Sequence, residues 1–121
     1  MKRSKYGNVP TIGADGVRFA SKAEAKRDAE LLLLGRANKI HGIQRQPKFD
    51  LRVNGRLICR YVGDWSYRDG PAREHNSPLV VEDCKGVQTP AFKIKWALAK
   101  ALYPAIEWRL TAAGGGYRVA A

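Results

Sequence analysis

The stretch Leu79-Val80-Val81-Glu82-Asp83-Cys84-Lys85-Gly86 begins apolar, becomes acidic, then basic, and ends at a glycine. Its leading β-favouring residues predict a strand. Since side chains alternate along a strand, Asp83 and Lys85 should be neighbours on one face, roughly 7 Å apart. Glu82 points to the opposite face, as a solvated or a helix-facing acid. Asp83 and Lys85 form either a plain ion pair or a catalytic pair, because a carboxylate can hold a divalent metal while an amine positions a water.

The composition predicts one small domain with a polyanionic partner. The chain has 121 residues and is 45% hydrophobic, which is enough for a core. Its 22 Lys and Arg outnumber 11 Asp and Glu, and the net charge of +11 favours nucleic acid as the partner. A membrane surface is the weaker rival, because no basic amphipathic segment stands out and the longest apolar run, Leu31 to Leu34, is too short to span a bilayer.

The cysteines and histidines indicate a cytoplasmic protein without a zinc site. Cys59 and Cys84 have no CxxC spacing, and no signal peptide is recognisable, so we expect a reducing compartment. His41 and His75 have no partner at ligand spacing, which argues against zinc.

The part of the chain before residue 40 predicts a basic arm and a helix. Residues 1–12 are expected to be an N-terminal arm, either a solubilising tail or a phosphate-contacting segment, and residues 13–121 a single domain. Ser21 and Glu24 form a capping box that starts a helix from about Lys22 to Ala37. We expect one apolar stripe on this helix, formed by Ala25, Ala29, Leu32 and Leu33 and widened by Leu31 and Leu34. We expect the following cations to face solvent: Lys22, Lys26, Arg27 and Arg36.

The middle of the chain predicts a hairpin at Asn54-Gly55, the strongest short-range turn signal in the sequence. Pro47 makes the preceding strand an edge strand or a bulged one. The second strand of the hairpin is expected to continue through Tyr67. Asp64 would then share a face with apolar neighbours, which is an unfavourable place for a carboxylate without a metal or a partner.

The last part predicts a helix and a strand. Thr89 and Pro90 read as the N-cap and first residue of a helix that runs to about Leu102, and residues 105–110 alternate as a strand. Residues 117–119 are a candidate final strand. The fold class is therefore α/β, a mixed sheet of about four strands flanked by helices.

Three acids from separate elements can converge in such a fold. Asp64 and Asp83 would lie on neighbouring strands, Glu24 would lean over from the first helix, and Lys85 would stand beside Asp83. Carboxylate oxygens are the ligands that Mg²⁺ prefers, and Mn²⁺ is an alternative. The surrounding positive charge would hold a DNA backbone.

This arrangement resembles the PD-(D/E)XK nuclease superfamily. More closely, the chain resembles a family of small phage and prophage proteins long catalogued as a domain of unknown function. The resemblance covers roughly residues 5–110. It is carried by Lys5-Tyr6-Gly7-Asn8, Phe19-x-Ser21-Lys22-x-Glu24, Gln46-Pro47-Lys48-Phe49, Tyr61-x-x-Asp64-Trp65 and Val81-Glu82-Asp83-Cys84-Lys85-Gly86 followed by Thr89-Pro90.

The resemblance implies a restriction-endonuclease-like core and a Mg²⁺-dependent DNA endonuclease. Asp64, Asp83 and the backbone carbonyl of Cys84 would bind the metal, and Glu24 would support it directly or through water. Lys85 would orient or activate the attacking water. The expected DNA contacts are Lys93, Lys95, Lys22 and Lys5.

Two departures from the superfamily pattern are visible. Gly63 stands where a proline often precedes the first acid, and Asp83 is one methylene shorter than the usual glutamate. The substrate suggested by the resemblance is branched DNA, such as a Holliday junction in phage recombination, which would require a homodimer in the host cytoplasm. The alternative is a catalytically inactive DNA-binding protein; an RNA-binding accessory protein is less favoured, because no aromatic platform motif is present.

Overall fold

The computed structural model describes residues 10–13 and 16–112. Its elements are β1 (Thr11–Ile12), β2 (Arg18–Phe19), α1 (Lys22–Arg36), β3 (His41–Arg45), β4 (Lys48–Val53), β5 (Arg56–Val62), β6 (Trp65–Arg68), β7 (Leu79–Lys85), α2 (Pro90–Leu102) and β8 (Glu107–Ala112). The end of the segment expected to be an arm forms β1, which pairs with β2. The rest of that arm, with Lys5, and the candidate strand at 117–119 lie outside the described residues.

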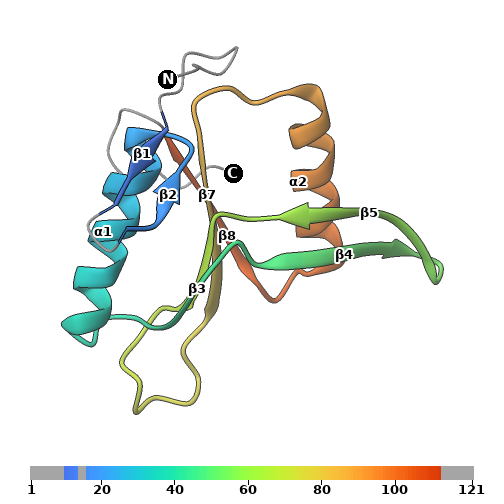
Figure 1. Cartoon of the computed structure of the whole chain (residues 1–121). Helices are drawn as coiled ribbons and strands as arrows, with labels where there is room; N and C mark the ends of the chain where they lie inside the picture. The colour runs from blue at the N-terminus through green and yellow to red at the C-terminus, as the bar shows by residue number, and fades with distance from the viewer. Residues whose placement is uncertain (1–9, 14–15, 113–121) are drawn as a thin grey trace.

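The main sheet has four strands in the order β3-β6-β7-β8. The pairs β3–β6 and β6–β7 are antiparallel, and β7–β8 is parallel, so α2 is the crossover between two parallel strands. In Figure 1, α1 and α2 lie on opposite sides of the β7–β8 pair. The predicted α/β class, with a mixed sheet of about four strands flanked by helices, is confirmed.

Alternation along β7 divides the interior into two cores. Val81 faces α2 and packs in a cluster with Tyr61, Phe92, Trp96 and Trp108. Val80 and Cys84 face the other way, in a cluster that includes Leu31 of α1, Ile40, Trp65 and Tyr67. The acidic end of β7 thus has one side chain, Asp83, on the α2 side and another, Glu82, on the α1 side.

The ends of both helices are as predicted. Ser21 caps α1, since its Oγ accepts a hydrogen bond from the backbone N–H of Glu24 at 3.2 Å. Thr89 caps α2 in the same way, accepting from Phe92 N–H at 3.1 Å, and Pro90 is the first helical residue. The first turns of both helices lie near the end of β7, since Glu24 of α1 and Phe92 of α2 line one cavity with Cys84 and Lys85.

The predicted apolar face of α1 is confirmed at Leu31 and wrong at Leu33 and Leu34. Its buried residues are Arg27, Asp28 and Leu31, while Leu33 is 62% exposed. Arg27, expected to face solvent, is buried because the sheet beneath α1 presents Glu82. The helix therefore buries its ionic residues against ionic partners, and part of its leucine run is left outside.

The expectation of one long strand through Tyr67 is also wrong, because the chain changes sheets at Gly63-Asp64. The N–H of Gly63 donates to the carbonyl of Pro47 at 3.0 Å, and the N–H of Asp64 donates to the carbonyl of Glu82 at 3.2 Å. A Cβ on Gly63 would lie 3.0 Å from Val81 Cγ1, which explains why a glycine stands here in a tightly packed crossing.

The hairpin at Asn54-Gly55 is confirmed. Both turn residues have positive φ, 50° and 77°, as a type I′ turn requires. The strands β4 and β5 form a separate two-stranded sheet that projects from the body beside α2 (Figure 1). No helix in the described part of the chain is long and apolar enough to cross a membrane.

Candidate active site

Asp83 is the most deeply buried member of the candidate site, with only 1% of its surface exposed. The hydroxyl of Tyr61 donates a hydrogen bond to its Oδ2. Its Oδ1 accepts no hydrogen bond from any described residue, and Lys85 Nζ lies 3.5 Å away from it. One carboxylate oxygen is thus held by the protein while the other keeps its capacity for a ligand.

Asp64 reaches the same place from the crossing between β5 and β6. Its Oδ2 accepts a hydrogen bond from the backbone N–H of Cys84 at 2.7 Å, which ties the side chain to the end of β7. The structure therefore brings Asp64 and Asp83 together. Asp64 lies just before β6 and Asp83 lies in β7, so β6 and the loop that follows it separate them along the chain.

Burial and the nearby Asp64 carboxylate both raise the energy of the charged form of Asp83. Burial is the main reason that the pKa of Asp83 rises to about 8, and repulsion from Asp64 adds to it. The ammonium of Lys85 and the hydroxyl of Tyr61 lower the same pKa but do not cancel the rise. Asp83 is consequently protonated in much of the folded protein at neutral pH unless a cation replaces the proton.

Glu24 joins this group from the first turn of α1, where it also completes the cap by accepting a hydrogen bond from Ala20 N–H at 3.4 Å. Burial raises its pKa to about 7, with a further contribution from Asp64, whereas Ala20 N–H and Lys85 lower it. A cavity of about 460 Å³ is lined by both Glu24 and Asp64. In this one position Glu24 both caps the helix and faces the cavity that Asp64 lines, so the two interpretations do not exclude each other.

Lys85 and Cys84 differ in what they can offer. The amine of Lys85 is partly exposed and lies 4.9 Å from the centre of the Phe92 ring. The thiol of Cys84 is buried, and burial is the main cause that raises its pKa to about 12, with nearby carboxylates adding to the effect. It stays protonated at neutral pH, so the backbone of Cys84, and not its sulfur, is the group suited to a metal.

The donor set fits a hard cation that needs few protein ligands. Among the described residues, no group of three or more His, Cys, Asp or Glu side chains could hold a metal ion. Two carboxylates, one with an oxygen that accepts no hydrogen bond from the described residues, remain. Mg²⁺ commonly binds through one or two carboxylates and keeps several waters. Glu24 is then suited to act through a water instead of as a direct ligand.

Three of the lysines expected to contact DNA, Lys22, Lys93 and Lys95, lie in the described part of the chain. Lys22 is exposed at the start of α1, and Lys93 is exposed on the first turns of α2. Lys95 is half-buried and lines a cavity together with Lys85. The positions on the two helices are thus at the end of β7 that carries Asp83.

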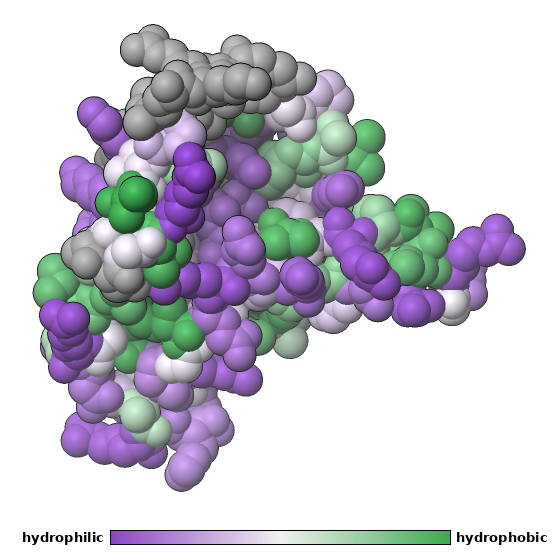
Figure 2. Space-filling model, in the orientation of Figure 1, coloured by the Kyte–Doolittle hydropathy of each residue, from purple (hydrophilic) through white to green (hydrophobic). Residues whose placement is uncertain are grey.

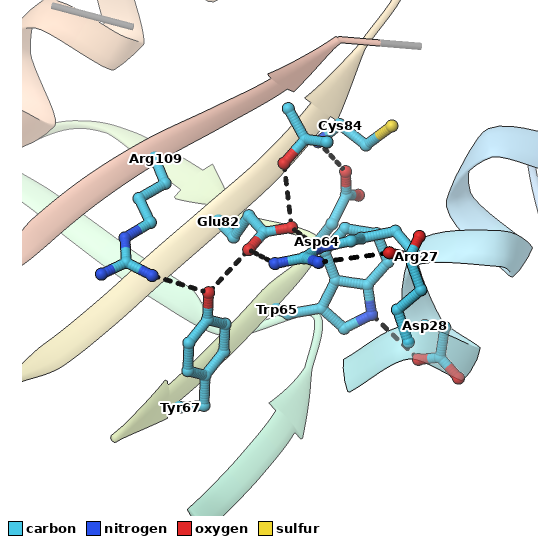
Figure 3. A network of polar contacts seen from close by, with 10 residues as sticks. Arg27, Asp28, Asp64, Trp65, Tyr67, Glu82, Cys84 and Arg109 are labelled. Carbon is cyan, nitrogen blue, oxygen red and sulfur yellow. Dashed lines mark hydrogen bonds and ion pairs between the residues drawn. The ribbon is translucent and has the colours of Figure 1, made fainter. Parts of the chain in front are cut away.

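An ionic network that no sequence pattern indicated lies on the opposite face of β7 and is drawn in Figure 3. Glu82 is fully buried and accepts hydrogen bonds from Arg27 Nε at 2.6 Å, Tyr67 Oη at 2.7 Å and Thr111 Oγ1 at 2.9 Å. Arg109 donates to Tyr67 Oη at 3.3 Å. The helix-facing interpretation of Glu82 is correct and the solvated one is wrong.

A second polar cluster, formed by Asp28, Arg45 and Trp65, borders the 460 Å³ cavity. Arg45, which lines that cavity, donates to both oxygens of Asp28 at 2.9 and 2.7 Å, and Trp65 Nε1 donates to Asp28 Oδ1 at 2.9 Å. Tyr61 and Trp65 stand in the motif Tyr61-x-x-Asp64-Trp65, but the sequence assigned no role to either side chain. Asp28 and Arg45 are marked by neither periodicity nor spacing.

One comparison with known proteins gives a match. The family model described as "Protein of unknown function (DUF1064)" matches residues 3–114, which is nearly the whole chain. No curated protein and no solved structure matches it significantly.

Proposed function

The chain belongs to the DUF1064 family, and we propose that it is a Mg²⁺-dependent endonuclease of the PD-(D/E)XK type that hydrolyses phosphodiester bonds in DNA. The proposal takes the metal to be Mg²⁺, or Mn²⁺ in its place. Asp64 and Asp83 would bind it with the carbonyl of Cys84, and Glu24 would support it through a water.

The observation that carries the proposal is the environment of Asp83. Burying a carboxyl group to 1% exposure beside a second carboxyl group is unfavourable for folding. Such groups are often found at functional sites. Its Oδ1, which accepts no hydrogen bond from the described residues, lies 3.5 Å from the amine of Lys85. A bound cation would replace the proton on Asp83 and remove the repulsion from Asp64.

The residues of the site supply the remaining parts of a hydrolysis. Mg²⁺ bound there would polarise the phosphodiester and acidify a water. The Lys85 amine donates hydrogen bonds to the attacking water or to the charge that develops on the phosphate. Tyr61 keeps Asp83 oriented through its hydrogen bond to Oδ2. Glu24, whose pKa is about 7, is able to take up a proton from water near neutral pH.

The net charge of +11 supports DNA as the substrate. A branched molecule such as a Holliday junction, cut by a homodimer in the cytoplasm of a phage host, is the narrower form of the proposal. The alternative is a protein of this fold that binds DNA without cutting it. Binding alone, however, gives no reason to bury carboxylates beside a polyanion.

A cleavage assay tests the proposal. Purified protein is mixed with a labelled four-way junction, a matched linear duplex and a single strand, with Mg²⁺, Mn²⁺ or EDTA. We expect cleavage with the metal ions that is lost in Asp83→Ala and Lys85→Ala and kept in Lys100→Ala, a control on the far half of α2. Metal-independent cleavage, or no cleavage of any substrate, would contradict the endonuclease and favour the DNA-binding alternative.

Metal binding provides a second readout that does not depend on finding the substrate. Mg²⁺ should raise the melting temperature of the wild type, since a ligand that binds only the folded state stabilises it. Asp83→Asn should remove most of this gain, whereas Asp50→Asn, on the exposed hairpin, should leave it unchanged. Equal gains in all three proteins would place the metal elsewhere.

A further inference from the structure

Three hollows follow one another along the end of β7. The first is the 460 Å³ cavity lined by Glu24 and Asp64. The second, of about 160 Å³, is lined by Glu24, Cys84 and Lys85. The third, of about 310 Å³, is lined by Lys85 together with Arg60 of β5 and Lys95 of α2. Neighbouring hollows share Glu24 or Lys85 as a lining residue, so the three lie side by side along the candidate active site.

We propose that the third hollow, named the Arg60 pocket, binds a backbone phosphate of the DNA strand next to the phosphate that is cleaved. The proposal rests on the proposed function for its substrate. It adds a phosphate-binding residue, Arg60, that belongs to none of the sequence motifs, and it gives Lys95 a defined place.

The charge of the pocket is the first argument. Its lining residues are Arg60, Tyr61, Val62, Lys85, Thr89, Ala91, Phe92 and Lys95. Three of these are cationic and none of these lining residues is acidic. Thr89 is also the N-cap of the 13-residue helix α2, whose positive dipole end therefore borders the pocket. This lining suits a phosphodiester, which carries one negative charge and several acceptor oxygens.

The position of the pocket is the second argument. Lys85 borders it on one side and stands 3.5 Å from Asp83 Oδ1 on the other. A strand that presents one phosphate to Lys85 and the metal-binding carboxylates would carry its next phosphate into the pocket. In the view of Figure 2, hydrophilic side chains gather in the middle of the molecule, between α1 and the hairpin of β4 and β5.

Asp50 competes with the proposed ligand for Arg60. Arg60 Nε donates to Asp50 Oδ1 at 2.9 Å, but the two side chains are 64% and 44% exposed, and exposed ion pairs of this kind are weak. Asp50 has a second cation, Arg52 Nη2, at 3.8 Å, so it keeps a partner when Arg60 turns to a phosphate. A phosphate must therefore displace one carboxylate, and removing that carboxylate should strengthen DNA binding.

The fold does not depend on these side chains. The backbone carbonyl of Asp50 accepts a hydrogen bond from Tyr103 Oη at 2.8 Å, which anchors the hairpin to the end of α2 whatever the side chain at position 50. The inner face of the hairpin is held by Leu51 and Tyr61 in the α2 core. Substitutions at Asp50 and Arg60 thus change the charge at the pocket and leave its supports in place.

The test is a DNA-binding titration by fluorescence anisotropy, with Ca²⁺ in place of Mg²⁺ and labelled duplex, junction and single strand as probes. At about 0.1 M salt, Arg60→Gln and Lys95→Gln should each weaken binding about fivefold, and each should reduce the slope of log affinity against log salt by about one. Asp50→Asn should tighten binding by a factor of about two to five. The matched controls, Arg56→Gln at the hairpin turn and Lys100→Gln on α2, remove the same charge outside the pocket and should change affinity less than about twofold.

Each outcome decides between distinct conclusions. Equal effects of Arg60→Gln and Arg56→Gln, or no gain in Asp50→Asn, would overturn the pocket, even if Mg²⁺-dependent cleavage is found. Loss of binding in Arg60→Gln with no cleavage by the wild type would overturn the endonuclease and retain the pocket. A mononucleotide that binds as tightly as the DNA probes would overturn the assignment to a backbone phosphate.

Discussion

Replacement of Asp83 by Asn should stabilise this protein, and by more as the pH rises. Unfolded aspartate loses its proton near pH 3.8, whereas burial and Asp64 hold the pKa of folded Asp83 at about 8. Below pH 3.8 Asp83 is protonated in both the folded and the unfolded state, so its ionisation does not lower the free energy of unfolding. Between pH 3.8 and about 8 folding must take up a proton, so the free energy of unfolding falls as the pH increases. Asparagine does not ionise in the folded or the unfolded state, so its replacement of Asp83 removes this loss of stability.

The size of the effect follows from the same pKa. Holding a proton from pH 3.8 up to pH 7 corresponds to an upper limit of about 4 kcal/mol, and to about 2 kcal/mol at pH 5. Because the charges of Asp64 and Lys85 also act on the ionisation of Asp83, about half of the limit is expected, or about 2 kcal/mol at pH 7. For a chain of this length that is a rise of roughly 8 °C in melting temperature.

Urea denaturation followed by circular dichroism, in EDTA and at several pH values between about 4 and 8, measures the effect. Asp83→Asn should match the wild type near pH 4 and exceed it increasingly toward pH 8. The control Asp50→Asn, on the exposed hairpin, should show no such trend. A variant that is less stable than the wild type throughout, or a gain that does not change with pH, would refute the reasoning that the buried Asp83 carboxyl destabilises the fold.

Three further substitutions test other parts of the structure. Glu82→Gln removes the charge of the buried carboxylate that Arg27 binds and should lower the free energy of unfolding by about 3–5 kcal/mol. The double change with Arg27→Met should cost less than the sum of the two single changes, and urea denaturation measures both effects. Tyr61→Phe removes the donor to Asp83 Oδ2 and should cost about 1–2 kcal/mol and weaken Mg²⁺ binding in calorimetry; unchanged metal affinity would exclude the orienting role. Gly55→Ala forces a Cβ into a backbone with φ of 77° and should cost about 1–2 kcal/mol, with a thermal melt as the check.

Much of this protein is determined locally, and the sequence alone was sufficient there. The caps at Ser21 and Thr89 and the turn at Asn54-Gly55 depend on residues within a few positions, whose hydrogen bonds and φ angles are properties of the local chain. The alternation in β7, which separates Asp83 from Glu82, is likewise a consequence of strand geometry. The helices, the hairpin and the acidic strand could therefore be predicted.

Only the tertiary structure decided how these parts meet. The chain leaves one sheet for another at Gly63, where a Cβ would lie 3.0 Å from Val81 Cγ1. The next residue, Asp64, accepts a hydrogen bond from the N–H of Cys84. The inward turn of Arg27 follows from a carboxylate 55 positions away, a partner that the helical periodicity of apolar residues does not reveal. The energies of such contacts depend on burial and on distant charges, which exist only once the chain has folded.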